Sequence, residues 1–176
     1  MSFIYSEAER LAKLHGTRNP YELLDAIGAK LVFSDQYKLN GLKGFAAIIN
    51  RQKFVIVNAK LDEVERMIVA GHEAGHLILH EDIIASSPAF AIKDFNVYDN
   101  TGRLELEANT FIANFLVTDN DVLESLAETD NFYITSKELF MPAQLLAIKM
   151  ADMLRRGYAV RSPESIDSKF LGKSFR

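Results

Sequence analysis

The chain has 176 residues, of which 48% are hydrophobic and 25% are charged. This composition is typical of a folded globular protein with a sizeable core, and the length suits one domain, or one domain with a small helical extension. The net charge of −4 argues against a protein whose main task is to bind a nucleic-acid backbone, and the absence of cysteine excludes disulfides and cysteine metal ligands.

Two short helices are predicted at the N-terminal end. Ser6 and Glu9 form a capping-box pattern, which predicts a helix that ends near Gly16. Asn19 followed by a proline suits an N-cap and a first helical position, so a second helix is predicted from there to about Gly28.

Three short runs rich in β-branched and aromatic residues predict strands at 30–33, 45–49 and 54–57. The last two runs are separated by the polar stretch 50–53, which predicts a hairpin. We therefore expect a small, mostly antiparallel sheet.

A central helix is predicted after the strands. Asp62 and Glu65 form a capping box that opens a helix over 63–80. Its apolar residues lie around most of its circumference, which is typical of a buried helix. An irregular segment at 85–102 follows, and then a helix over 103–117.

Residues 72–76 read His-Glu-Ala-Gly-His, the H-E-x-x-H pattern, inside this buried helix. Residues four apart lie on one face of a helix, so His72 and His76 can share one tetrahedral zinc ion. Glu73 lies beside the same face and can accept a proton from water without being a ligand. The pattern therefore predicts a metal site with Glu73 as the catalytic base.

A catalytic zinc site requires a third protein ligand, and the candidates are His80, Glu105 and Glu107. His80 lies eight residues after His72, roughly 12 Å along a helix axis, too far for both to bind one ion unless the helix breaks. We therefore place His80 next to the site or at the helix end. Geometry alone does not choose between Glu105 and Glu107, which lie on the next predicted helix.

Two segments resemble the ImmA/IrrE family of metallopeptidases: 72–80, HEAGHLILH, and 105–117, ELEANTFIANFLV. That family carries an H-E-x-x-H helix and a second helix with an E-A-N-x-F-A signature, whose glutamate is the third metal ligand. The resemblance maps this ligand onto Glu107. It extends over about 19–157, although Val117-Thr118 stands where the family often has Met-Pro.

The resemblance implies an α+β fold: a zincin-like, mostly helical domain with a small antiparallel sheet and a C-terminal helical part. We divide the chain into a metallopeptidase core at 1–118, a C-terminal helical subdomain of short helices at 119–160, and a tail at 161–176. Pro142 is expected at a helix start and Gly157 at a helix end.

The resemblance also implies a function, because family members cleave helix-turn-helix repressors. We expect a zinc-dependent, site-specific endopeptidase, with manganese as the alternative metal, that acts as an anti-repressor of phage, mobile-element or stress genes. The alternative is a non-proteolytic anti-repressor that binds its partner and carries a structural metal site. Tyr98 is a candidate donor for the oxyanion.

The partner predicted from the resemblance is a repressor protein. The helices at 121–157 and the basic stretch at 149–176 are free to bind it. Direct nucleic-acid binding is not expected. The N-terminus lacks the features of a signal peptide, and polar residues interrupt the most apolar stretch, 67–79, so a cytoplasmic protein without a membrane span is expected.

Overall fold

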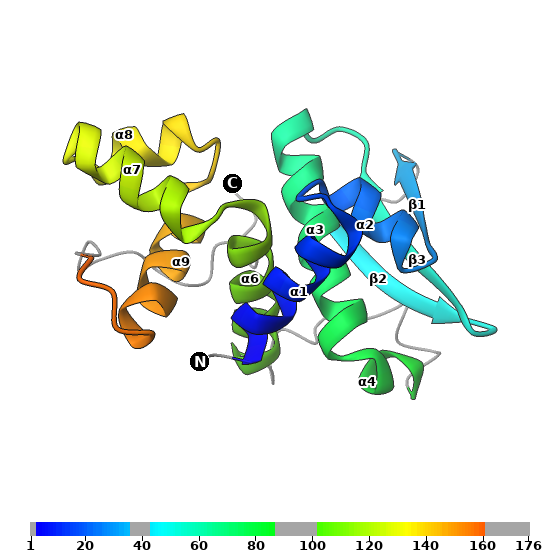
Figure 1. Ribbon diagram of the computed structural model, residues 1–176. Coiled ribbons are helices and arrows are strands. Elements are labelled where there is room, and N and C mark those ends of the chain that lie inside the picture. The colour runs from blue at the N-terminus through cyan, green and yellow to red at the C-terminus, as the bar shows by residue number, and fades with distance from the viewer. Residues whose placement is uncertain (1–2, 36–42, 87–101, 161–176) are drawn as a thin grey trace.

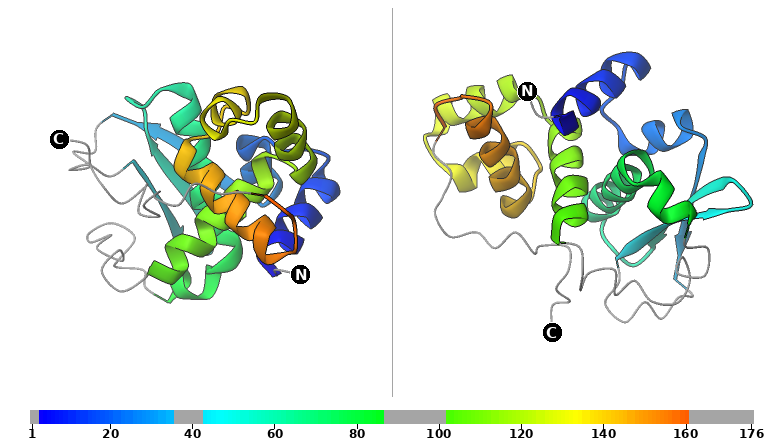
Figure 2. Two further views of the ribbon diagram at one scale, coloured as in Figure 1. Left: turned by 90° about the vertical axis from the view of Figure 1, so that its left-hand side faces the viewer. Right: turned by 90° about the horizontal axis from the view of Figure 1, so that it is seen from below.

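A computed structural model describes residues 3–35, 43–86 and 102–160. Helix α6 (Gly102–Leu116) lies in the middle of the molecule, with α3 (Glu63–Leu79) and a sheet on one side and the C-terminal helices on the other (Figures 1 and 2). The other elements are α1 (Phe3–His15), α2 (Pro20–Ala26), β1 (Ala29–Ser34), β2 (Gly44–Ile49), β3 (Gln52–Asn58), α4 (Glu81–Ala85), α7 (Asp119–Thr129), α8 (Phe132–Glu138) and α9 (Ala143–Arg155). This arrangement confirms the predicted α+β class with C-terminal helices.

The three strands form one sheet in the order β1-β3-β2. β2 and β3 pair antiparallel, as the predicted hairpin requires, but β1 pairs with β3 in parallel. The sheet is therefore mixed, and the expectation of an antiparallel sheet is wrong for β1. The hairpin turn is also shorter than predicted, because Asn50 and Arg51 alone connect the strands, both at positive φ (51° and 65°).

Local capping signals place two of the helix starts. The Asn19 side chain accepts a hydrogen bond from the backbone N–H of Tyr21 at 2.9 Å, at the start of α2. The Asp62 side chain accepts one from the N–H of Glu65 at 2.8 Å, at the start of α3. Both predictions are confirmed. The predicted start at Ser6 is wrong, since α1 begins at Phe3 and contains Ser6.

Helices α3 and α6 pack closely because α3 has glycine where the two helices meet. A Cβ atom on Gly71 would lie 2.0 Å from Ile112 Cδ1, and one on Gly75 would lie 3.3 Å from both Cα and the carbonyl oxygen of Ala108. Larger side chains would separate the helices. This close packing brings side chains of α6 within reach of the polar groups on α3.

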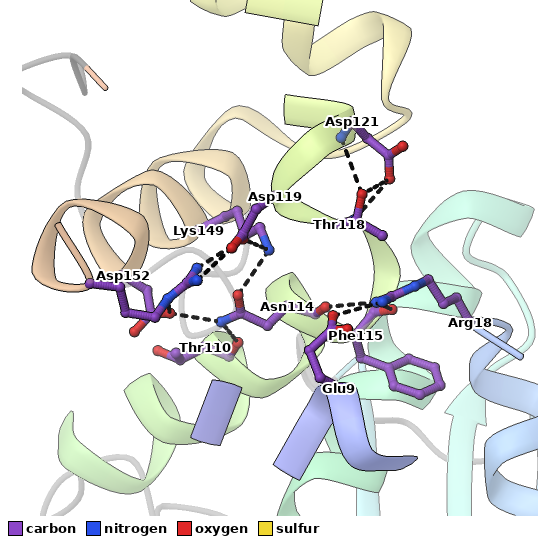
Figure 3. A network of polar contacts seen from close by, with 11 residues as sticks. Glu9, Arg18, Thr110, Asn114, Phe115, Thr118, Asp119, Asp121, Lys149 and Asp152 are labelled. Atoms are coloured by element: carbon purple, nitrogen blue, oxygen red, sulfur yellow. Dashed lines mark hydrogen bonds and ion pairs between the residues drawn. The ribbon is translucent and has the colours of Figure 1, made fainter. Parts of the chain in front are cut away.

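A buried network of charges joins α6 to the C-terminal helices (Figure 3). Lys149 on α9 is fully buried, and its Nζ lies 2.7 Å from Asp119 Oδ1 and 2.9 Å from Asn114 Oδ1. Arg156 donates to both carboxylate oxygens of Asp119 and, through Nε, to Asp152. Two cations and two carboxylates therefore balance one another at this junction.

Some predictions fall outside what the structure tests. Tyr98 and the tail at 161–176 lie outside the described residues. The division at residue 118 stays a prediction. Pro142 does precede α9 and Gly157 follows it, with φ at 97°, as expected. None of the helices in the described ranges combines the length and apolar character needed to cross a membrane.

Candidate metal centre

His72 and His76 lie one turn apart on the buried part of α3. Their Nε2 atoms are 3.1 Å apart, and the two rings meet at 87°, edge to face. The His72 side chain is 3% exposed and that of His76 is 12% exposed. Both rings thus direct the same nitrogen at one point, as the H-E-x-x-H spacing predicts.

Glu105, in the first turn of α6, completes this cluster. Its Oε2 lies 3.2 Å from His72 Nε2, and its Oε1 lies 3.2 Å from His76 Nε2. Two ligands held ~2.0–2.1 Å from a tetrahedral zinc ion are separated by roughly 3.3 Å. The spacing of the three groups therefore fits one metal ion, and His72, His76 and Glu105 are a group that could hold it.

The glutamate expected from the family resemblance lies elsewhere. Glu107 Oε2 is 3.0 Å from His80 Nε2, and its Oε1 accepts a hydrogen bond from Arg103 Nε at 2.7 Å. Successive helix residues are ~100° apart, so two residues of separation turn Glu107 away from the side of α6 that carries Glu105. We therefore correct the candidate ligand set: Glu105 takes the place of Glu107.

Asn109 orients His72. Its Oδ1 lies 3.0 Å from His72 Nδ1, and both side chains are buried. An amide oxygen can only accept, so this contact requires a proton on His72 Nδ1, and the lone pair of Nε2 is then available to a metal ion that takes the place of the Nε2 proton. Asn109 lies four residues after Glu105, on the same face of α6, and that spacing is the signal that could have favoured Glu105 in the sequence.

The donor set suits a cation. Glu105 is held in its charged form: burial alone would raise its pKa, but hydrogen bonds with His72 and His76 outweigh burial and hold the pKa well below the ordinary value. The carboxylate of Glu105 and the Nε2 atoms of His72 and His76 thus converge at one point. Such a group is stable when a positive charge lies between its members.

Glu73 is buried beside the cluster, with 4% of its surface exposed. Burial raises the pKa of its carboxyl to about 7, and the charge of Glu105 acts in the same direction, while His76 and a hydrogen bond from the backbone of Ala46 oppose the rise. A carboxyl with a pKa near 7 can both accept and return a proton at neutral pH. Glu73 thus lies beside the cluster, and its role as catalytic base stays a prediction.

His80 lies near the cluster but not in it. It caps the C-terminus of α3, and its Nδ1 lies 3.0 Å from His76 Nδ1, on the opposite side of that ring from Nε2. Burial lowers the pKa of His80, and its hydrogen bond with Glu107 opposes that shift. Among the described residues, the group able to hold a metal has three members, so a site closed by His80 as a fourth ligand is not indicated.

Comparison with known proteins identifies the family of the chain. A family model described as the IrrE N-terminal-like domain, Peptidase_M78, matches residues 27–151. The chain belongs to this family. The matched range includes α3, α6 and every residue of the candidate centre. The family is one of peptidases, so membership supports a metallopeptidase-type function.

A curated relative comes from a phage. The chain is 31% identical over 118 residues to the "Uncharacterized immunity region protein 2" of Bacillus phage phi105. The match covers 67% of this chain and 70% of the relative. Its printed name places that protein in an immunity region and assigns it no activity.

Proposed function

We propose that this protein is a metal-dependent endopeptidase that cleaves a helix-turn-helix repressor at one or a few peptide bonds. The observation that carries the proposal is the meeting of three ligand groups, from His72, His76 and Glu105, next to the buried carboxyl of Glu73. Metal ligands and a general base in one place are what metal-dependent peptide hydrolysis requires.

We further propose that the ion is zinc, with manganese as the alternative, because two imidazoles and one carboxylate suit zinc. When bound, zinc acidifies a water molecule and polarises the substrate carbonyl. His72 and His76 bind through Nε2, and Glu105 binds through its carboxylate. Three protein ligands leave a fourth position for water or substrate.

In this mechanism Glu73 moves the proton. A carboxylate oxygen of Glu73 accepts the proton of the attacking water, and the same oxygen then delivers it to the nitrogen of the leaving amine. A positioned acid–base group of this kind contributes typically 10²–10⁴-fold to the rate. Burial holds Glu73 beside the ligand groups, where one carboxylate oxygen can serve first as base and then as acid.

The proposed substrate rests on three supports. The chain belongs to a peptidase family, it resembles a phage protein from an immunity region, and the family resemblance is to enzymes that cleave repressors. Site-specific cleavage also suits a small enzyme without a compartment of its own, because selectivity then comes from recognition of one partner. We propose that the C-terminal helices α7–α9 bind that partner.

The test incubates the purified protein, with zinc and separately with manganese, with the repressor encoded nearest its gene and with unfolded casein. A single cut in the repressor, abolished by chelator and by Glu73→Gln, is expected. Glu63→Gln, which changes an exposed glutamate on the same helix, is the matched control and should keep activity. Rapid digestion of casein with an intact repressor refutes the proposed specificity, and a repressor bound but never cut supports a non-proteolytic anti-repressor.

A further inference from the structure

His76 has a hydrogen-bond partner on each side of its ring. Nε2 faces His72 and Glu105, while Nδ1 lies 3.0 Å from Nδ1 of His80. His80 is 6% exposed and is fixed to the helix by its backbone N–H, which donates to the carbonyl of His76 at 2.9 Å. The two rings are thus held next to each other by the last turn of α3.

The chain of contacts continues from His80 to the second helix. His80 Nε2 lies 3.0 Å from Glu107 Oε2, and Glu107 Oε1 accepts a hydrogen bond from Arg103 Nε at 2.7 Å. Arg103 is 87% exposed, so the series ends at the surface of the protein. It runs from the metal-facing ring through a buried ring and a carboxylate to solvent.

Protons can occupy this series in one way that leaves His76 ready to bind a cation. Glu107 is a carboxylate and only accepts, so His80 carries its proton on Nε2 and presents a lone pair at Nδ1. That lone pair accepts the Nδ1 proton of His76. His76 can then offer the lone pair of Nε2 to a metal ion beside Glu105, as a metal ligand must.

For His72, a single contact favours the tautomer with its proton on Nδ1. A single amide, Asn109, accepts the Nδ1 proton of His72 at 3.0 Å. No such amide is within hydrogen-bonding distance of His76 Nδ1 among the contacts of the described residues. His80 and Glu107 together therefore occupy the place that Asn109 occupies for the other histidine.

We propose that His80 and Glu107 are a positioning pair that holds the His76 imidazole in the tautomer and orientation required for metal binding. This inference rests on the proposed metal site and names residues outside its ligand set. It also gives a role to Glu107, which the family signature suggested as a ligand: Glu107 lies two hydrogen bonds from the ligand His76. Removing partners of this type typically weakens metal affinity 10–100-fold.

The experiment measures the dissociation constant for zinc by competition with a chromophoric chelator, and the visible spectrum of the cobalt-substituted protein. His80→Ala should weaken zinc binding 10–100-fold, and Glu107→Ala should do the same. The double variant should be no weaker than His80→Ala alone, because both residues act through one hydrogen bond to His76. One metal ion per chain should still bind at saturation.

Conservative variants separate positioning from packing. His80→Gln can accept from His76 and donate to Glu107, so it should recover most of the lost affinity and the wild-type cobalt spectrum. His15→Ala changes an exposed histidine outside the site and is the matched control. If His80→Gln binds zinc as weakly as His80→Ala, and the metal-free forms of both variants are destabilised to the same extent, the role of His80 is packing and the inference fails.

Two further outcomes contradict the inference. A His80→Ala protein that binds no metal at any concentration would make His80 a ligand. His80→Ala and Glu107→Ala proteins with wild-type affinity would leave the pair without a role. In both cases a loss of metal in Glu105→Ala would keep the proposed function intact, whereas a wild-type protein that binds no metal would refute the proposed function itself.

Discussion

The buried charges at the junction of α6, α7 and α9 allow a sharp test of how the C-terminal helices are held. Lys149 has no exposed surface, and its partners are the carboxylate of Asp119 at 2.7 Å and the amide oxygen of Asn114 at 2.9 Å. Asp119→Asn removes the negative charge and keeps the shape. Lys149 is then left with neutral acceptors in a site that water does not reach.

The magnitude follows from what each variant leaves unpaired. Removing one partner of a buried pair costs about 3–5 kcal/mol, a large part of the roughly 5–15 kcal/mol that stabilises a typical domain. Lys149→Met should cost less, about 1–2 kcal/mol. Asp119 loses its contact with Lys149 but keeps both hydrogen bonds from Arg156, so only the side-chain oxygen of Asn114 is left without the donor shown here. The double variant, Asp119→Asn with Lys149→Met, should be more stable than Asp119→Asn alone.

The assay is urea unfolding of the metal-free protein at neutral pH, followed by circular dichroism. Asp25→Asn, at an exposed aspartate of α2, is the matched control and should shift the free energy of unfolding by no more than about 0.5 kcal/mol. The reasoning is refuted if Lys149→Met costs more than Asp119→Asn. It is also refuted if the costs of the two single variants simply add in the double variant, since that would mean that the two charges do not interact.

Three further predictions concern pH and packing. The pKa of Asp119 is held below its ordinary value, because the hydrogen bonds from Arg156 and Lys149 outweigh burial. The contribution of Asp119 to stability should therefore be present above about pH 4 and be lost as pH falls further. Urea titrations at several pH values should show this loss, and it should be smaller in Asp119→Asn. Gly71→Ala drives a methyl group into Ile112, and overpacking of about 1–3 kcal/mol should exceed the gain of about 1 kcal/mol in helix propensity, with Ile112→Val restoring stability in the same assay. Gly75→Ala meets backbone atoms at 3.3 Å and should push α3 from α6, which should weaken zinc affinity about tenfold in a chelator competition.

The features that the sequence predicted well are local. The caps at Asn19 and Asp62 depend on residues within four positions. His72 and His76 lie next to each other because residues four apart share one face of a helix. The order and direction of the strands do not follow from such patterns, because periodicity indicates a strand and not its neighbours. β1 runs parallel to β3, and α2, just before β1, contacts both β1 and α3, so the direction of β1 goes with contacts between elements and not with its own residue pattern.

The third ligand shows the same limit within the site. Glu105 and Glu107 stand two apart on one helix, so the rotation of α6 about its own axis decides which of them meets the histidines. That rotation is set where Gly75 on α3 packs against Ala108, a contact between residues that are distant in the chain. The family signature suggested Glu107 as the ligand. The asparagine of the same signature, Asn109, contacts His72 and lies on the same face of α6 as Glu105, which indicates Glu105 instead.

A metal ion held by α3 and α6 together would act as a cross-link between two parts of the chain. His76 and Glu105 are separated by about 30 residues, so an unfolded chain, in which closing such a loop is costly, cannot present the complete site. Binding and folding are then linked, and metal at a thousand times its dissociation constant stabilises the folded state by about 4 kcal/mol. Because α6 also carries Asn114 into the charged junction with α9, chelation should loosen both ends of this helix, and the melting temperature should report the free metal concentration.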